Sequence, residues 1–247
     1  MIWDKFIGGL NQSQSFRKLC QLYESGHRLF GLTGPCEAGK ALALAGLYSR
    51  RPRAILWITP SDEEAERQRD NLEVLLGPEP VRGWAAWDIL PGDQREPDVE
   101  LVGSRMECLQ AQAGRRPTVI LASARSVVQR TLAPAEFAAR RMELAVGLRV
   151  DRDELLARLV NSGYQRQPVV SGIGEFSLRG SIIDIAGYGQ DGPLRLELED
   201  DTLASLRRFS LVDQRSTGRL ERAEVLPQTE DSGDRKSTRL NSSHGKL

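Results

Sequence analysis

Residues 34–41 read Gly34-Pro35-Cys36-Glu37-Ala38-Gly39-Lys40-Ala41, and this stretch indicates the fold of the first part of the chain. Its spacing is that of a phosphate-binding loop, G-x-x-x-x-G-K-[ST], in which backbone N–H groups surround the phosphates, the lysine neutralises them and a hydroxyl binds Mg²⁺. Gly34, Gly39 and Lys40 keep this spacing, whereas Ala41 has no oxygen to offer a metal ion. We therefore interpret the loop as vestigial, and we expect neither ATP hydrolysis nor a bound cofactor in this chain.

Two further residues of the loop oppose phosphate binding. Glu37 places a negative charge where an anion would bind, and Pro35 removes one backbone N–H donor. The flanking sequence still fits the fold, because residues 29–33 have the character of a short strand and residues 38–48 are rich in helix-forming alanine and leucine. A chance glycine loop between a strand and a helix is the alternative interpretation.

Composition limits the class of protein. The 247 residues are long enough for one large domain or two small ones, and a hydrophobic content of 40% is ordinary for a globular core. Lysine and arginine together equal aspartate and glutamate at 34 each, so the overall charge does not indicate a dedicated nucleic-acid binder.

Cysteine usage and hydrophobicity indicate the compartment. The three cysteines lie far apart and there are only two histidines, which argues against a disulfide framework or a zinc site and fits a reducing cytosol. We find neither a signal peptide nor an apolar run long enough to span a membrane, and we expect a cytoplasmic protein with no membrane partner.

The C-terminal residues 234–247 are interpreted as an artefact. Residues 234–244 match the in-frame translation of a common DNA-sequencing adapter, and we expect this tail to be disordered and exclude it from the fold. Without it, 30 basic and 33 acidic residues give a net charge of −3. We further expect the gene to continue, so that the chain is an N-terminal fragment of a longer protein.

Residues 1–128 alternate between predicted helices and strands. Helices are predicted over residues 11–27, 61–76 and 124–132 and from Asp98 onward, with Ser61 and Glu64 forming a capping box. The apolar runs at 53–59 and 118–122 predict fully buried parallel strands. This alternation predicts an α/β fold with a parallel-sheet domain over residues 1–128.

The pattern changes after residue 128. Asp151 and Glu154 predict a capped helix ending at Gly163, and short runs separated by glycine follow at 169–170, 175–179, 181–185, 194–198 and 203–209. The alternation in 194–198 is typical of a half-exposed antiparallel strand. We predict a smaller inserted α+β module over 129–212, followed by the start of a return into the first domain over 213–233.

Four segments carry a resemblance to a known family. They are 30–34 with the loop; 57–61 with 63–67; 84–91 continuing through Pro97 to Arg105; and 174–185 together with 207–209 and 213–216. With these segments the chain resembles the N-terminal, UvrB-homologous module of bacterial transcription-repair coupling factors (the Mfd family), over residues 16–230. The resemblance implies a degenerate P-loop domain of helicase (RecA-like) type with an inserted module that binds UvrA.

The resemblance also implies binding residues. The arginine of the Arg-Gly pair in the inserted module, here Arg179, is expected to face acidic groups of UvrA, because a guanidinium forms bidentate bonds to carboxylates. Arg166 lies next to the family's second basic position, which is Gln165 here, and Phe176 is a third candidate. Ala186 replaces the family's aromatic residue. Without the resemblance, Arg179 is more simply an exposed strand arginine near Glu175.

Two alternatives remain open at this point. One is an ATP-dependent, UvrB-type excision-repair helicase subunit, and the other is an inactive α/β scaffold with an unknown partner. In the favoured interpretation the chain recruits UvrA to stalled RNA polymerase. The family's contacts with RNA polymerase and double-stranded DNA, and its use of ATP and Mg²⁺, then belong to domains beyond this chain.

Overall fold

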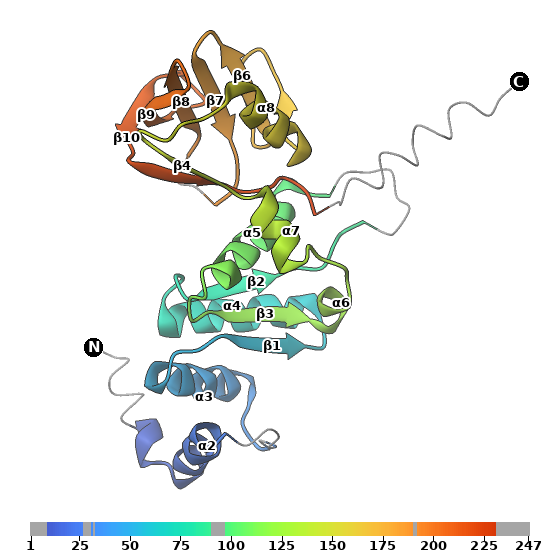
Figure 1. Cartoon of the computed structure of the whole chain (residues 1–247). Helices are drawn as coiled ribbons and strands as arrows, with labels where there is room; N and C mark the ends of the chain where they lie inside the picture. Colours follow the sequence, from blue (N-terminus) through green and yellow to red (C-terminus); the bar gives the residue numbers. More distant parts are fainter. Residues whose placement is uncertain (1–8, 27–30, 32, 90–96, 190–191, 231–247) are drawn as a thin grey trace, which may run out of the picture. The chain divides into compact units, whose positions relative to one another are not determined.

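The computed structural model describes residues 9–26, 31, 33–89, 97–189 and 192–230. It divides into two compact units (Figure 1), which are described separately. Unit 1 comprises Met1–Asp88 and Gly114–Gln129, and unit 2 comprises Ile89–Ala113 and Arg130–Leu247. The adapter-like tail and residues 29, 30 and 32 of the strand predicted over 29–33 lie outside the described residues.

Unit 1 has helices around a parallel three-stranded sheet of order β1-β3-β2. Its elements are α2 (Gln14–Glu24), α3 (Glu37–Arg50), β1 (Ile55–Thr59), α4 (Asp62–Leu76), β2 (Val81–Trp84), β3 (Val119–Ser123) and α6 (Ala124–Val127). The helix cap predicted at Ser61 is confirmed, because its hydroxyl accepts a hydrogen bond from the Glu64 N–H at 3.2 Å. A core of small and branched side chains joins α3 and α4 to the sheet.

Three sequence predictions for unit 1 need comment. The strand predicted at 53–59 was expected to be fully buried, but Leu56 and Ile58 on β1 are 53% and 51% exposed. A run of apolar residues does not reveal that only one face of a strand is covered. The helix predicted over 124–132 ends at Val127, and the next helix starts at Pro134, which disfavours helical backbone in the residue before it. In the part of 29–33 that is described, no strand is present.

Unit 2 contains two sheets and three helices among its described residues. Its elements are α5 (Val99–Ala113), α7 (Pro134–Arg140), β4 (Met142–Ala145), α8 (Arg152–Asn161), β5 (Gln165–Arg166), β6 (Glu175–Arg179), β7 (Ile182–Ala186), β8 (Leu194–Glu199), β9 (Thr202–Phe209), β10 (Ser216–Arg219) and β11 (Arg222–Val225). The larger sheet has the order β10-β9-β8-β7-β6-β5 and is antiparallel except for the β5–β6 pair. The mixed α/β class predicted from the sequence is confirmed.

The core of unit 2 lies on one face of the six-stranded sheet. Alternate side chains of β8, among them Leu194 and Leu196, point into it, which confirms the alternation seen in the sequence. Helix α8 contributes Leu155 and Leu159 to the same core, so it covers this face. Its predicted cap is also confirmed, since the Asp151 carboxylate accepts a hydrogen bond from the Glu154 N–H.

Residues near 225 form a strand that pairs within unit 2. We predicted a return into the first domain from this region, but β11 pairs antiparallel with β4, a strand the sequence analysis did not identify. The short apolar run at 169–170 lies in a loop. Runs this short carry little periodicity, and the partner of β11 is distant in the sequence, so the pairing could not be predicted.

Helix α5 is fixed to unit 2 by buried polar contacts. The Arg105 guanidinium donates two hydrogen bonds to the Glu230 carboxylate, at 2.7 Å and 3.1 Å, and both side chains are buried. Gln110 donates a hydrogen bond to Glu224 at 2.6 Å. Gly103 faces the ring of Tyr188 so closely that a Cβ atom there would lie 2.6 Å from Cδ1.

Replacing Arg105 tests the buried ion pair. We expect Arg105→Met to lower the free energy of unfolding of unit 2 by about 3–5 kcal/mol, because it leaves the Glu230 carboxylate buried without its guanidinium. Arg149→Met is the matched control, since Arg149 forms an exposed pair with Asp201 and should cost under about 1 kcal/mol. Urea denaturation gives both values, and equal effects would contradict the structural role of Arg105.

Replacing Gly103 tests the approach of Tyr188 to α5. A glycine-to-alanine change inside a helix ordinarily stabilises by roughly 0.5–1 kcal/mol. We expect Gly103→Ala instead to destabilise by about 1–3 kcal/mol, because the new methyl group meets the Tyr188 ring. The same change in a Tyr188→Leu background should cost less. A stabilising Gly103→Ala in thermal unfolding would show that this contact does not exist.

Candidate protein-interaction surface

The face of the six-stranded sheet opposite the core carries a row of polar side chains. Strand pairing sets the row in register: Ser177 is opposite Asp184, Asp184 opposite Arg195, Arg195 opposite Arg207, and Arg207 opposite Arg219. These residues alternate with core residues along their strands, so they point to the other side of the sheet. The row runs across five neighbouring strands, from β6 to β10.

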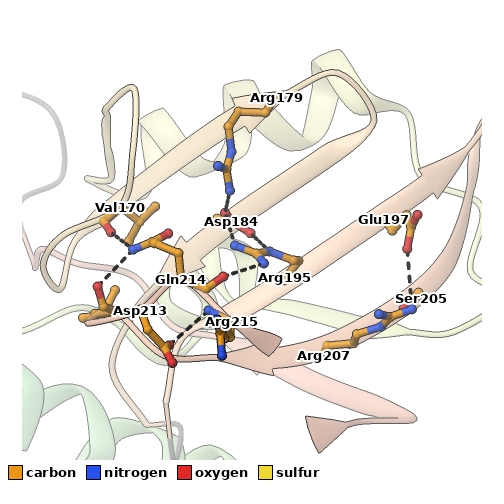
Figure 2. Close-up of polar contacts among 11 residues, drawn as sticks. Val170, Arg179, Asp184, Arg195, Glu197, Ser205, Arg207, Asp213, Gln214 and Arg215 are labelled. Atoms are coloured by element: carbon orange, nitrogen blue, oxygen red, sulfur yellow. Dashed lines mark hydrogen bonds and ion pairs between the residues drawn. The ribbon is translucent and has the colours of Figure 1, made fainter. Parts of the chain in front are cut away.

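Asp184 is the centre of this polar face. Its carboxylate is 0% exposed and receives two hydrogen bonds from Arg195, at 2.7 Å and 2.9 Å, in the bidentate arrangement that is strongest for this pair. Arg179 Nη2 donates a third bond at 2.6 Å (Figure 2). One buried negative charge is therefore shared by two guanidinium groups.

Arg195 is fixed by its surroundings, whereas Arg179 reaches the surface. The Arg195 guanidinium also lies 4.7 Å from the centre of the Phe209 ring and donates to the Gln214 carbonyl at 2.9 Å (Figure 2). The hydrogen bonds to Asp184 raise the pKa of the Arg195 guanidinium above its ordinary value. Arg195 is 17% exposed and Arg179 is 45% exposed. Because two guanidinium groups share the single charge of Asp184, the more exposed Arg179 presents a surplus positive charge to solvent.

The three sequence-predicted binding residues do not share one face. Arg166 pairs in register with Phe176, and Gln165 with Glu175, so it is Gln165 that lies in register with the Arg179 face. Phe176 is 1% exposed and belongs to the core. The structure therefore gives Phe176 a packing role and leaves Arg179 and the exposed Arg166 as accessible candidates.

Neighbouring residues shape the surroundings of Arg179. Glu175 does not pair with Arg179; its carboxylate instead accepts hydrogen bonds from the Ser171 N–H and hydroxyl and the Gly172 N–H, and these bonds, led by the Ser171 N–H, lower its pKa. Ala186 is buried against Val170 and Phe209. Sequence reasoning missed Asp184 and Arg195, although the alternation of β8 already placed Arg195 opposite the core face.

The loop at 34–41 has its lysine engaged within unit 1. Gly34 has a positive φ of 100°, and α3 begins at Glu37. Lys40 Nζ donates a hydrogen bond to Glu37 Oε1 at 2.7 Å, and Gln68 donates to the other oxygen at 2.9 Å. This pairing lowers the pKa of Glu37 and raises that of Lys40. Ala41 is packed in the core, so a side chain at this position points away from solvent.

Other kinds of site are not supported by the described residues. Among them, no group of three or more histidine, cysteine, aspartate or glutamate side chains is arranged to hold a metal ion. In the same part of the chain, no helix is both long and apolar enough to cross a membrane.

Comparison with known proteins relates the chain to one family. Residues 142–230 match the family model of the UvrB interaction domain. The chain is 32% identical over 212 residues to the transcription-repair-coupling factor of Myxococcus xanthus, covering 82% of this chain and 17% of that protein. It is 30% identical over 217 residues to the corresponding factor of Staphylococcus aureus, covering 87% of this chain and 18% of that protein.

The matched region includes the whole polar face of the sheet, since β5 to β10 all lie within residues 142–230. The chain spans less than a fifth of the length of these relatives. The resemblance stated from the sequence is confirmed. Over most of its length this chain is similar to the transcription-repair-coupling factors, and its residues 142–230 match the UvrB interaction domain.

Proposed function

We propose that the chain is the interaction module of a transcription-repair-coupling factor and that unit 2 recruits UvrA. The observation that carries this proposal is Arg179, a half-exposed arginine with surplus charge on the polar face of the UvrB interaction domain. Among the residues that the structure describes, Arg179 donates one bond, to Asp184, so its other guanidinium N–H groups remain for a carboxylate of the partner.

The arrangement around Arg179 favours binding for a physical reason. An arginine side chain free in solvent loses about 0.5–1.5 kcal/mol of conformational entropy when an interface immobilises it. The bond to the buried Asp184 already restricts Arg179 in the free protein, so less of that cost remains at binding. Arg166 lies on the edge strand β5 in register with the opposite face, so we assign it a secondary contact at this edge.

The proposal assigns no catalysis to this chain. We interpret the glycine–lysine loop as a vestigial phosphate-binding loop, because Lys40 is hydrogen-bonded to Glu37 and the side chain of Ala41 is packed in the core. ATP and Mg²⁺, RNA polymerase and double-stranded DNA are proposed to be bound elsewhere in the longer protein. A cytoplasmic location follows from the same role.

A UvrB-type helicase subunit is the second candidate, and an inactive scaffold is the third. The helicase candidate needs a lysine free for phosphate and a hydroxyl for the metal ion. Lys40 is paired with Glu37, and Ala41 supplies no hydroxyl. The scaffold candidate does not explain why Arg179, a second arginine, is bonded to the buried Asp184 carboxylate.

Arg179→Ala tests the proposed function. We expect it to weaken binding of the chain to purified UvrA by at least about tenfold, since the interface loses a charge-assisted contact. The midpoint of thermal unfolding should change little, because Arg195 still balances Asp184. Titration calorimetry and thermal unfolding give the two values.

Arg152→Ala is the control for this experiment. Arg152 is an exposed arginine on α8, the helix that covers the opposite face of the sheet, and its loss should leave UvrA binding unchanged. UvrA binding that survives Arg179→Ala would remove Arg179 from the site. Equal losses in the two variants would show that only overall charge matters.

Nucleotide binding tests the vestigial loop. A ligand that binds the folded state stabilises it by RT ln(1 + [L]/Kd) and so raises the thermal unfolding midpoint. Because we expect the loop not to bind nucleotide, millimolar Mg²⁺-ATP should leave this midpoint unchanged. Lys40→Ala should behave identically. A saturable shift in the wild type that Lys40→Ala abolishes would contradict the proposal and favour the helicase candidate.

A further inference from the structure

Two arginines beyond Arg179 share its face of the sheet and are not accounted for by the fold. Arg207 on β9 is opposite Arg195, and Arg219 on β10 is opposite Arg207. Resting on the proposed function, we propose that the UvrA-binding surface continues from Arg179 across the sheet to Arg207 and Arg219, and that these arginines face acidic side chains of UvrA.

Arg207 is only weakly neutralised within the chain. Its Nε donates a hydrogen bond to the Ser205 hydroxyl at 2.8 Å, which directs the guanidinium along the sheet surface (Figure 2). The closest approach to a carboxylate is 3.8 Å, from Nη2 to Glu197, and both side chains are more than a third exposed. A pair with this separation and exposure contributes little to stability.

Arg219 is exposed and has no ion pair with any residue that the structure describes. It lies on β10, which is an edge strand of the sheet in this part of the chain. A charged residue on an edge strand also prevents sheets from pairing with one another, and this is the competing explanation for Arg219. A positive or a negative charge would protect the edge strand equally well, whereas binding an acidic partner requires a positive charge.

The charges along the row favour an acidic partner. Arg179, Arg195, Arg207 and Arg219 share this face with the carboxylates of Asp184, Glu197 and Glu175. Asp184 is buried and bonded to two arginines, and Glu175 accepts its hydrogen bonds from Ser171 and Gly172. Neighbouring strands are about 4.8 Å apart, so the row from β6 to β10 extends over roughly 19 Å. This length suits one side of a standard protein–protein interface of about 800 Å² per partner.

A protein partner fits this surface better than nucleic acid. Nucleic-acid sites present continuous positive charge to the phosphates. Here Glu197 is opposite Ile182, which is itself opposite Arg179, and the Glu197 carboxylate lies 3.8 Å from Arg207 Nη2. The hairpin at 199–201 adds Glu199, Asp200 and Asp201 at the end of β8. Alternating charges of this kind match discrete carboxylates and repel a phosphate backbone.

Charge reversal in the full chain separates these explanations. We expect Arg219→Glu and Arg207→Glu each to weaken binding to purified UvrA by about tenfold, and to flatten its dependence on salt concentration. Arg219→Glu keeps a charge on the edge strand, so solubility should be preserved. Arg152→Glu on α8 introduces the same charge change on the other side of the sheet and should leave binding unchanged.

The variants must be compared with Arg179→Ala. Loss of binding in Arg179→Ala with wild-type binding in both Arg207→Glu and Arg219→Glu would overturn the extended surface and leave the proposed function intact. Wild-type binding in Arg179→Ala as well would overturn both. If Arg219→Glu weakens binding to a DNA duplex but not to UvrA, the surface is a nucleic-acid site and this inference is wrong.

Discussion

The buried carboxylate of Asp184 is the constraint around which unit 2 is organised. A carboxylate with no exposed surface is costly unless a cation and hydrogen bonds compensate it, and Arg195 provides both. Arg195 must itself be held, which requires the Phe209 ring and the Gln214 carbonyl. Gln214 in turn donates to the Val170 carbonyl, so the turn after β9 and the loop before β6 are tied to the same charge. With that charge already balanced, a further arginine on the same carboxylate is left to interact outward.

A second arginine–carboxylate pair, Arg105 with Glu230, joins helix α5 to the rest of unit 2. The family match ends at Glu230, but the guanidinium that satisfies Glu230 comes from Arg105 on α5, far outside the matched residues. Gly103 on the same helix accommodates Tyr188, which lies within the match. The folded unit is therefore larger than the region that the family model matches. Similarity to a family model follows contiguous sequence, whereas burial of a charge depends on residues brought together by the fold.

The sequence predicted features that depend on residues close together in the chain, and it missed those that depend on distant residues. Local signals held: the Ser61 and Asp151 caps act over three residues, and the alternation of β8 acts within one strand. The β4–β11 pair was not recognised, because each strand has four residues and the partners are about eighty residues apart. For the same reason Arg179 was predicted as a binding residue only through family resemblance, while its bond to Asp184 required the register of β6 and β7. Phe176, also predicted as a binding residue, lies on the core side of that register.

The glycine–lysine loop, which we interpret as vestigial, has its key positions engaged in packing and in an internal ion pair. Ala41 is part of the core formed by α3, α4 and the sheet, so its small size serves packing. A hydroxyl placed there would be buried and would need an internal partner before it could bind a metal ion. Glu37 meanwhile supplies Lys40 with the negative charge that a phosphate would bring, and Gln68 holds the carboxylate in place. Restoring the consensus residue at position 41 alone would therefore leave Lys40 still paired with Glu37, since an internal carboxylate is always present and a nucleotide must compete with it.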